Sequence, residues 1–173
     1  MRRDITEGKT GVALTMKMRL LDANNGCAPI ANAAIYLWHN DLAGAYSGYN
    51  QPTGNTVGET FLRGIQVTDS NGEVTFTTIY PGWYPGRVTH LHFQVFLDNG
   101  TGGTATATSQ IAFPDDVTAQ VYATPLYPRG PNTSVPNVES DGIFRDGADH
   151  QIATTTGDVD SGLVAELDVR IAV

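Results

Sequence analysis

Apolar side chains recur at every second residue over much of this chain, which is the period of a β-strand with one buried face. The alternation is longest near the two ends, at residues 12–20 and 163–173. Shorter stretches of strand-forming residues lie at 34–38, 61–68, 74–80, 88–97 and 104–113. Clusters of Asp, Asn, Ser and Gly at 69–72, 98–100 and 157–162 separate several of them. The pattern predicts strands joined by turns and loops.

One stretch, residues 114–122, predicts a helix instead, because a proline and two aspartates occupy its first turn. Residues 127–138 are rich in Pro, Asn and Ser and predict a surface loop. A chain of 173 residues suffices for one core and is short for two. We therefore expect a single all-β domain over residues 1–173. Its predicted architecture is an antiparallel β-sandwich with long loops and at most one or two short helices.

The charge balance narrows the possible partners. The chain has 10 Lys and Arg against 18 Asp and Glu, a net charge of −8, which would repel a phosphate backbone or an anionic membrane. No apolar run approaches the roughly 18 residues of a membrane span, and the first residues lack the apolar stretch of a signal peptide. Nucleic acid and membrane are therefore not expected partners. The single cysteine, Cys27, excludes an internal disulfide and a multi-thiolate metal site.

The segment 87–95, RVTHLHFQV, divides by strand alternation into two chemically different faces. One face carries apolar side chains that we expect in a core, namely Leu91, Phe93, Val95 and, just beyond, Leu97. His90 and His92 lie on the other face with about 7 Å between their Cα atoms. Two imidazoles so placed can bind one metal ion, and imidazole suits zinc, copper, iron and nickel. A His-x-His pair by itself is equally compatible with a structural role.

Two tyrosines stand close to this pair. The loop 81–86, PGWYPG, places Tyr84 between two turn-forming pairs just before the histidine strand, so the loop can fold Tyr84 over the histidines. Upstream, the segment 38–46, WHNDLAGAY, follows a predicted strand and ends in Tyr46. Neither His39 nor His150 has a partner at ligand spacing, so we expect both to be structural or exposed. We expect core or interface packing, and no metal binding, for the tyrosines at 36, 80, 122 and 127, namely Tyr36, Tyr80, Tyr122 and Tyr127.

In this order, the segments of the chain resemble the intradiol ring-cleavage dioxygenases, the family of catechol 1,2-dioxygenase and protocatechuate 3,4-dioxygenase. The resemblance covers most of the chain and is carried by residues 3–5, 29–33, 38–46, 62–64, 68–72, 76–82 and 87–92. It looks closest to the small, single-domain, often secreted members, which lack an N-terminal helical dimerisation segment. It thus implies a secreted protein whose signal peptide is absent here, although a cytoplasmic location stays open. The oligomeric state is not indicated.

The resemblance implies one Fe(III) per chain, with Tyr46 and His90 as equatorial ligands and Tyr84 and His92 as axial ones. It implies that Arg87 lies over the bound ring, that Gln110 lines the same pocket, and that Tyr84 is both ligand and general base. Phenolate and imidazole suit the ferric state, whereas a carboxylate with two histidines would suit iron(II). The implied reaction is cleavage of a catechol by O2 between its hydroxyl-bearing carbons, giving a cis,cis-muconate-type diacid.

Two alternatives stay open at this point. A non-catalytic transthyretin-like or carbohydrate-binding β-sandwich would share the strand pattern without needing two tyrosines and two histidines. A degenerate subunit of a hetero-oligomeric dioxygenase would share the resemblance without activity, although all four ligand positions are filled here. The preferred catechol is not indicated, but Arg63 or Arg129 could contact a carboxylated ring. Trp83 and Tyr49 are candidates for pocket walls or for simple packing.

Overall fold

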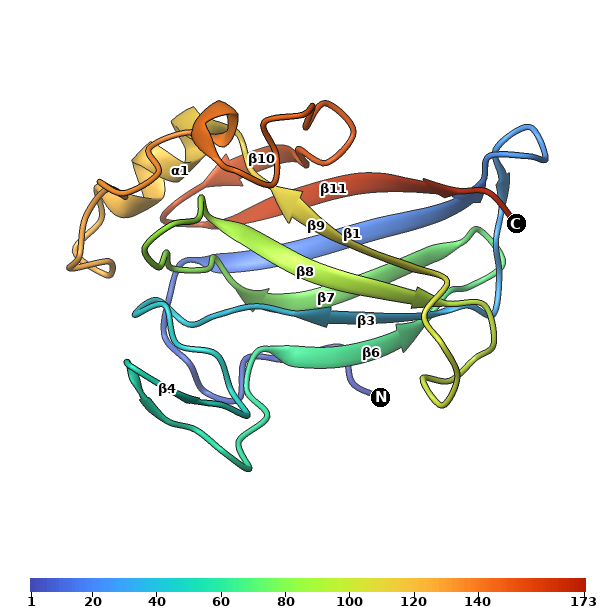
Figure 1. Ribbon diagram of the computed structural model, residues 1–173, viewed down its shortest axis with the longest axis horizontal. Helices are drawn as coiled ribbons and strands as arrows, with labels where there is room; N and C mark the ends of the chain where they lie inside the picture. Colours follow the sequence, from blue (N-terminus) through green and yellow to red (C-terminus); the bar gives the residue numbers. More distant parts are fainter.

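Two β-sheets packed face to face form the body of the molecule (Figure 1), as seen in a computed structural model that describes residues 1–173. The first sheet contains β1 (Ala13–Asp22), β2 (Ala28–Pro29), β7 (Glu73–Ile79), β10 (Thr154–Asp158) and β11 (Gly162–Ile171). The second, in the order β6-β3-β8-β9, contains β3 (Ala34–Trp38), β6 (Arg63–Val67), β8 (His90–Phe96) and β9 (Ala107–Ala112). The predicted all-β sandwich is confirmed.

Strand pairing is antiparallel except at one place. The two longest strands, β1 and β11, run parallel, from Leu14 opposite Leu163 to Asp22 opposite Ile171. On its other side β1 pairs with β7 and, near its end, with β2. The core lies between the sheets and consists of side chains from alternate residues of the facing strands. Burying a side chain of the size of Leu or Phe stabilises the fold by about 1.5–3 kcal/mol. The buried members include Leu14, Met16, Met18, Phe76, Leu91, Phe93 and Val95.

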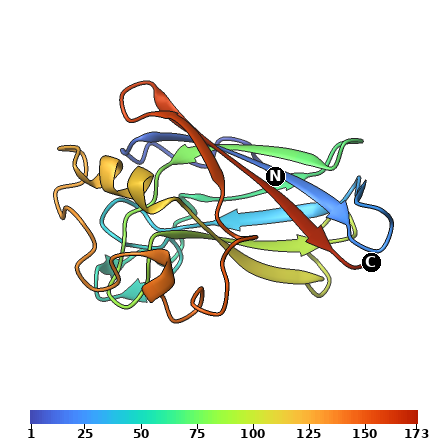
Figure 2. The same ribbon diagram turned by 90° about the horizontal axis from the view of Figure 1, so that it is seen from above.

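Helix α1 (Asp115–Tyr122) and the loops that follow it gather at one end of the sandwich (Figures 1 and 2). A second apolar cluster holds this loop region against the sheet and consists of Val88, Ala112, Val135, Val138, Phe144 and Ala148. The short 3₁₀-helix η1 (Val138–Ser140) belongs to the same region. Since Val88 precedes β8, the cluster fastens the loops beside the strand that carries the two histidines. No helix combines the length and the apolar composition that crossing a membrane requires.

Some local expectations were wrong. Leu97 does not face the core: it follows the last residue of β8 and is 39% exposed. The strand predicted at 104–113 begins only at Ala107, and that at 61–68 begins at Arg63. The sequence pattern also missed β10, which pairs with β11. It missed the short hairpin of β4 (Asn50–Gln51) and β5 (Gly54–Asn55) as well. These missed strands are short and polar, so they have no apolar alternation to reveal them.

Candidate metal centre

Strand β8 carries the two histidines as its alternation predicts. Leu91 and Phe93 are buried in the core, while His90 and His92 project from the opposite face. Their Nε2 atoms lie 3.1 Å apart. His90 is 2% exposed, and its Nδ1 lies 2.6 Å from the carbonyl oxygen of Val88. Because a carbonyl only accepts, Nδ1 carries the proton and Nε2 of neutral His90 keeps its lone pair for a metal ion.

Two loops bring the tyrosines to this face, and glycines let the loops pack backbone against backbone. A Cβ on Gly44 would stand 2.5 Å from the carbonyl oxygen of Trp83, and one on Gly82 would stand 2.5 Å from that of Leu42. The Tyr46 loop is shaped by Asp41, whose Oδ1 accepts hydrogen bonds from the backbone N–H groups of residues 43 and 45. Only residues without a Cβ allow this approach, so the glycines set the distance between the two tyrosine loops.

The two phenol oxygens meet the two imidazoles at one point. Tyr46 Oη lies 3.0 Å from His92 Nε2, and Tyr84 Oη lies 3.1 Å from His90 Nε2. Two ligand atoms about 2.1 Å from a shared ion, at right angles to each other, are about 3.0 Å apart. The distances therefore fit four side chains around one metal ion. The chain has no metal-binding group of three or more His, Cys, Asp or Glu side chains, so an ion here would need the phenol oxygens.

The electrostatic surroundings favour a cation. Burial lowers the pKa of His90 to about 4, and burial together with repulsion from His90, when that ring is protonated, lowers the pKa of His92 to about 3. Both rings are thus neutral near pH 7, with lone pairs available. Burial also raises the pKa of Tyr46 above its ordinary value, so a phenolate would be costly there without a neighbouring positive charge. A bound multivalent cation supplies that charge and favours deprotonation.

An aromatic stack supports His92 from the side. Trp38, opposite His92 in the β3–β8 register, lies parallel to its ring, with centroids 5.0 Å apart and planes 7° apart. Tyr36 stacks on Trp38 with ring centroids 4.9 Å apart and accepts a 2.9 Å hydrogen bond from Arg63. Arg63 also binds Ser47, the neighbour of Tyr46. Sequence reasoning missed Trp38, although its strand alternation with Tyr36 was a usable signal.

Arg87 and Gln110 lie beside the four side chains. Gln110 sits opposite His92 in the β8–β9 register, and its Oε1 accepts a hydrogen bond from Nη2 of Arg87. Nε of Arg87 donates to the carboxylate of Asp141 at 2.9 Å. Arg87 and Gln110 are therefore in contact in the fold. Asp141 was missed, because it lies 54 residues from Arg87 in a loop without a recognisable motif.

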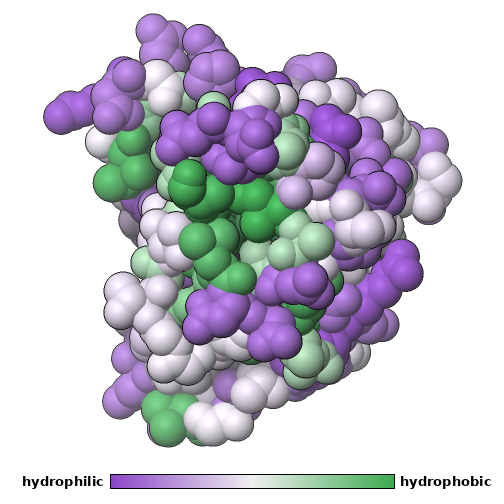
Figure 3. All heavy atoms as spheres, turned by 90° about the vertical axis from the view of Figure 1, so that its right-hand side faces the viewer, coloured by the Kyte–Doolittle hydropathy of each residue, from purple (hydrophilic) through white to green (hydrophobic).

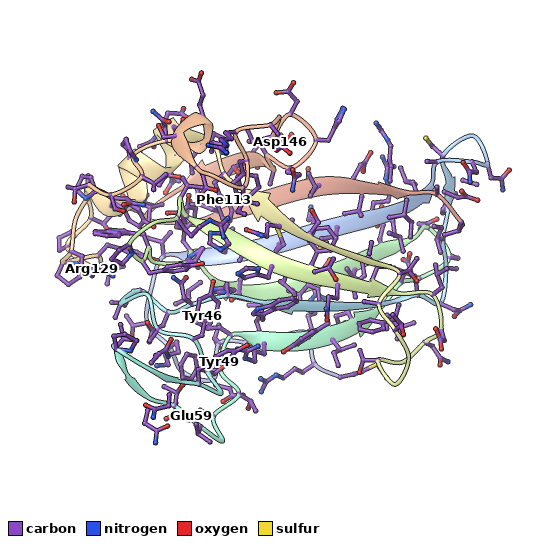
Figure 4. The ribbon with its side chains drawn as sticks, viewed as in Figure 1. Tyr46, Tyr49, Glu59, Phe113, Arg129 and Asp146 are labelled. Carbon is purple, nitrogen blue, oxygen red and sulfur yellow. The ribbon has the colours of Figure 1, made fainter.

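The remaining candidates lie outside this centre. His39 is fully buried between Thr78 and the Asn40 carbonyl, and His150 is exposed, as expected for both. Tyr49 is 53% exposed, and its ring makes an edge-to-face contact with that of Tyr46 (Figure 4). The guanidinium carbon of Arg129 lies 3.9 Å from the ring centroid of Trp83. Tyr80, Tyr122 and Tyr127 are buried.

A separate cleft lies beside the metal centre. A cleft of about 700 Å³ runs between β9 and β11 and shares with the centre only Gln110. Figure 3 faces the opposite end of the molecule, where an apolar patch is framed by hydrophilic side chains. Leu97 and Val173 are exposed apolar side chains of the chain. The candidate chemistry rests on the converging side chains and not on the size of a cavity.

The fold and the four converging side chains define a β-sandwich with a candidate metal centre, and comparisons specify the family. A family model described as Dioxygenase matches residues 1–124. The chain is 31% identical over 96 residues to the protocatechuate 3,4-dioxygenase beta chain of Burkholderia cepacia, covering 51% of this chain and 40% of that protein. It therefore spans well under half of that relative. The chain belongs to the intradiol ring-cleavage dioxygenase family.

Solved structures agree with this assignment. An intradiol ring-cleavage dioxygenase from Tetranychus urticae is 30% identical, with a TM-score of 0.87, and the match covers 99% of this chain and 86% of that one. Catechol 1,2-dioxygenase from Pseudomonas arvilla C-1 is 20% identical with a TM-score of 0.60, covering 96% and 54% of the two chains. The second likeness concerns the fold alone.

Proposed function

We propose that this chain is an iron(III)-dependent intradiol dioxygenase that cleaves a catechol-type 1,2-dihydroxybenzene with O2 to a cis,cis-muconate-type diacid. The observation that carries the proposal is the meeting of Tyr46, Tyr84, His90 and His92, whose donor atoms approach one another at 3.0–3.1 Å. Family membership supports the same reaction class. Both oxygen atoms of O2 enter the diacid, so the reaction needs no external reductant.

The donor set favours ferric iron. Two phenolates and two neutral imidazoles form a hard, anionic environment that suits the trivalent state better than the divalent one. The carboxylate of Asp141, beside Arg87, is engaged by Arg87 and by the backbone N–H of Val88. When bound, ferric iron would hold both catechol oxygens and draw electron density from the ring towards reaction with O2.

The protein side chains have distinct roles in this proposal. Tyr84, on the short loop before β8, would take the proton of a catechol hydroxyl at its Oη and so act as general base. Tyr46, His90 and His92 would keep the ion in place. The guanidinium of Arg87, held beside Gln110, would stabilise negative charge that develops on the ring during attack by O2.

A non-catalytic binding module is the rival proposal. Such a module has no need to bring two imidazoles and two phenols to one point, whereas a metal centre does. Colour separates the two proposals cheaply. An iron-loaded protein with tyrosinate ligands would be red-brown, and a metal-free binding module would be colourless.

The decisive experiment is oxygen uptake with a panel of catechol, protocatechuate, hydroxyquinol and chlorinated catechols, with products identified by mass spectrometry under ¹⁸O₂. We expect a ring-opened diacid containing both labelled oxygens. A coloured, iron-containing protein that opens none of these rings would contradict the proposed reaction while leaving the family and the fold intact. The same panel ranks the substrates, including any role of Arg63 or Arg129 in binding a ring carboxylate.

A further inference from the structure

Residues 132–141 hold the turn that connects Tyr84 to His90 by hydrogen bonds. This segment lies beyond the residues matched by the family model. Ser134 Oγ accepts from Gly86 N at 2.7 Å, and Asn132 Nδ2 donates to the carbonyl of Arg87 at 2.8 Å. The carboxylate of Asp141 accepts from Val88 N at 2.7 Å. Three successive residues of the turn are therefore held by one distant segment, which the cluster around Val88 and Phe144 anchors to the sheet.

Asp141 also holds the side chain of Arg87. It is fully buried, and its two oxygens lie 2.9 and 3.2 Å from Arg87 Nε. Burial by itself raises the pKa of Asp141, but hydrogen bonds from Val88 N, Ile143 N and Arg87 outweigh burial and lower it. The carboxylate is thus charged at neutral pH. A buried carboxylate is stable only when it is paired and hydrogen-bonded, as it is here.

The guanidinium is fixed at two of its three nitrogen atoms. Asp141 engages Nε, Gln110 engages Nη2, and the ring of Phe144 lies 5.8 Å from the guanidinium carbon. Nη1 has no hydrogen-bond partner among the protein groups. Arginine has one of the highest side-chain rotamer entropies. When its side chain is already fixed before substrate binds, the activation free energy does not include the loss of that entropy.

We propose that Asp141 is a positioning residue, which orients Arg87 towards the substrate in the dioxygenase reaction and does not itself touch substrate or metal. The inference rests on the proposed function. It assigns a task to the segment after residue 131, to which the ligand motifs give no clue. Its expected kinetic effect is a fall in kcat of about 10- to 30-fold for Asp141→Asn, the factor that corresponds to the rotamer entropy of one arginine.

A double-mutant cycle tests the proposal in the iron-loaded full chain. We expect Asp141→Asn to lower kcat with little change in KM, and the double variant Asp141→Asn with Arg87→Ala to be no slower than Arg87→Ala alone. Asp146→Asn is the matched control, because Asp146 lies exposed on the same loop (Figure 4) and has no ion pair. Losses of the two single variants that multiply in the double variant would overturn the proposal.

A readout independent of turnover comes from NMR of the full-length, metal-free chain. The Arg87 Nε–H signal, identified by its loss in Arg87→Lys, should exchange slowly with solvent in the wild type and rapidly in Asp141→Asn. Unchanged exchange would overturn the proposal. Should Asp141→Asn fail to fold, the smaller, neutral variant Asp141→Ser takes its place. If the wild type opens no ring, slow exchange lost in the variant still supports the orientation of Arg87, and only the proposed function fails.

Discussion

His39 makes the stability of this protein depend on pH in a way that can be calculated. Its ring is fully buried, with Nδ1 2.7 Å from the Asn40 carbonyl and Nε2 2.7 Å from Thr78 Oγ1. Since the carbonyl only accepts, Nδ1 donates and Nε2 accepts from the threonine hydroxyl, so the ring is neutral. Burial lowers the pKa of His39 from 6.5 to about 4. Protonation would therefore bury a charge.

The sign and size of the effect follow from linkage. Below its ordinary pKa of 6.5 the unfolded chain binds a proton at His39 that the folded chain refuses. The contribution of His39 to the free energy of unfolding is thus complete above pH 6.5, and it is lost as the pH drops from there to about 4. Each pKa unit of difference is worth about 1.4 kcal/mol, so this one residue accounts for about 3 kcal/mol of lost stability.

Urea unfolding of the metal-free chain, followed by circular dichroism, measures the effect. The comparison is His39→Gln, whose amide can donate to the Asn40 carbonyl and accept from Thr78 without titrating. His90 and His92 titrate in both proteins, so the difference in pH dependence isolates His39. We expect the wild type to lose about 3 kcal/mol more than His39→Gln between about pH 7 and pH 4. Equal losses in the two proteins would refute the reasoning.

Three further predictions concern the metal centre. Tyr84→Phe should bleach part of the visible band of the iron-loaded protein and slow oxygen uptake, and an unchanged spectrum would show that Tyr84 is not a ligand. Arg87→Ala should keep the spectrum but cost about 2–4 kcal/mol in the activation barrier, measured as kcat in oxygen uptake. Gly44 has a φ of +85°, and a Cβ added there would stand 2.5 Å from the carbonyl oxygen of Trp83. Gly44→Ala should therefore lower the free energy of unfolding, measured in urea, by about 1–3 kcal/mol. It should also weaken iron binding, measured by metal analysis, and wild-type iron affinity would contradict this.

Much of this protein was readable from local sequence. The period of two that placed Leu91 and Phe93 in the core also placed His90 and His92 together on the other face, because successive strand side chains point to opposite sides. The proline and aspartates before residue 117 predicted helix α1 almost to the residue. Local patterns succeed here because they depend only on backbone geometry within one element. The two tyrosines needed the family resemblance as well, since neither lies on a strand.

Other features were decided only by the tertiary structure. The parallel pairing of β1 with β11 joins residues about 150 positions apart, and neither strand differs in pattern from one with antiparallel neighbours. Asp141 acquires its role only because the second apolar cluster brings its loop beside Arg87. Trp38 supports His92 only through the β3–β8 register. Alternation tells which way a side chain points, whereas its contacts depend on which distant segment burial and hydrogen bonding bring against it.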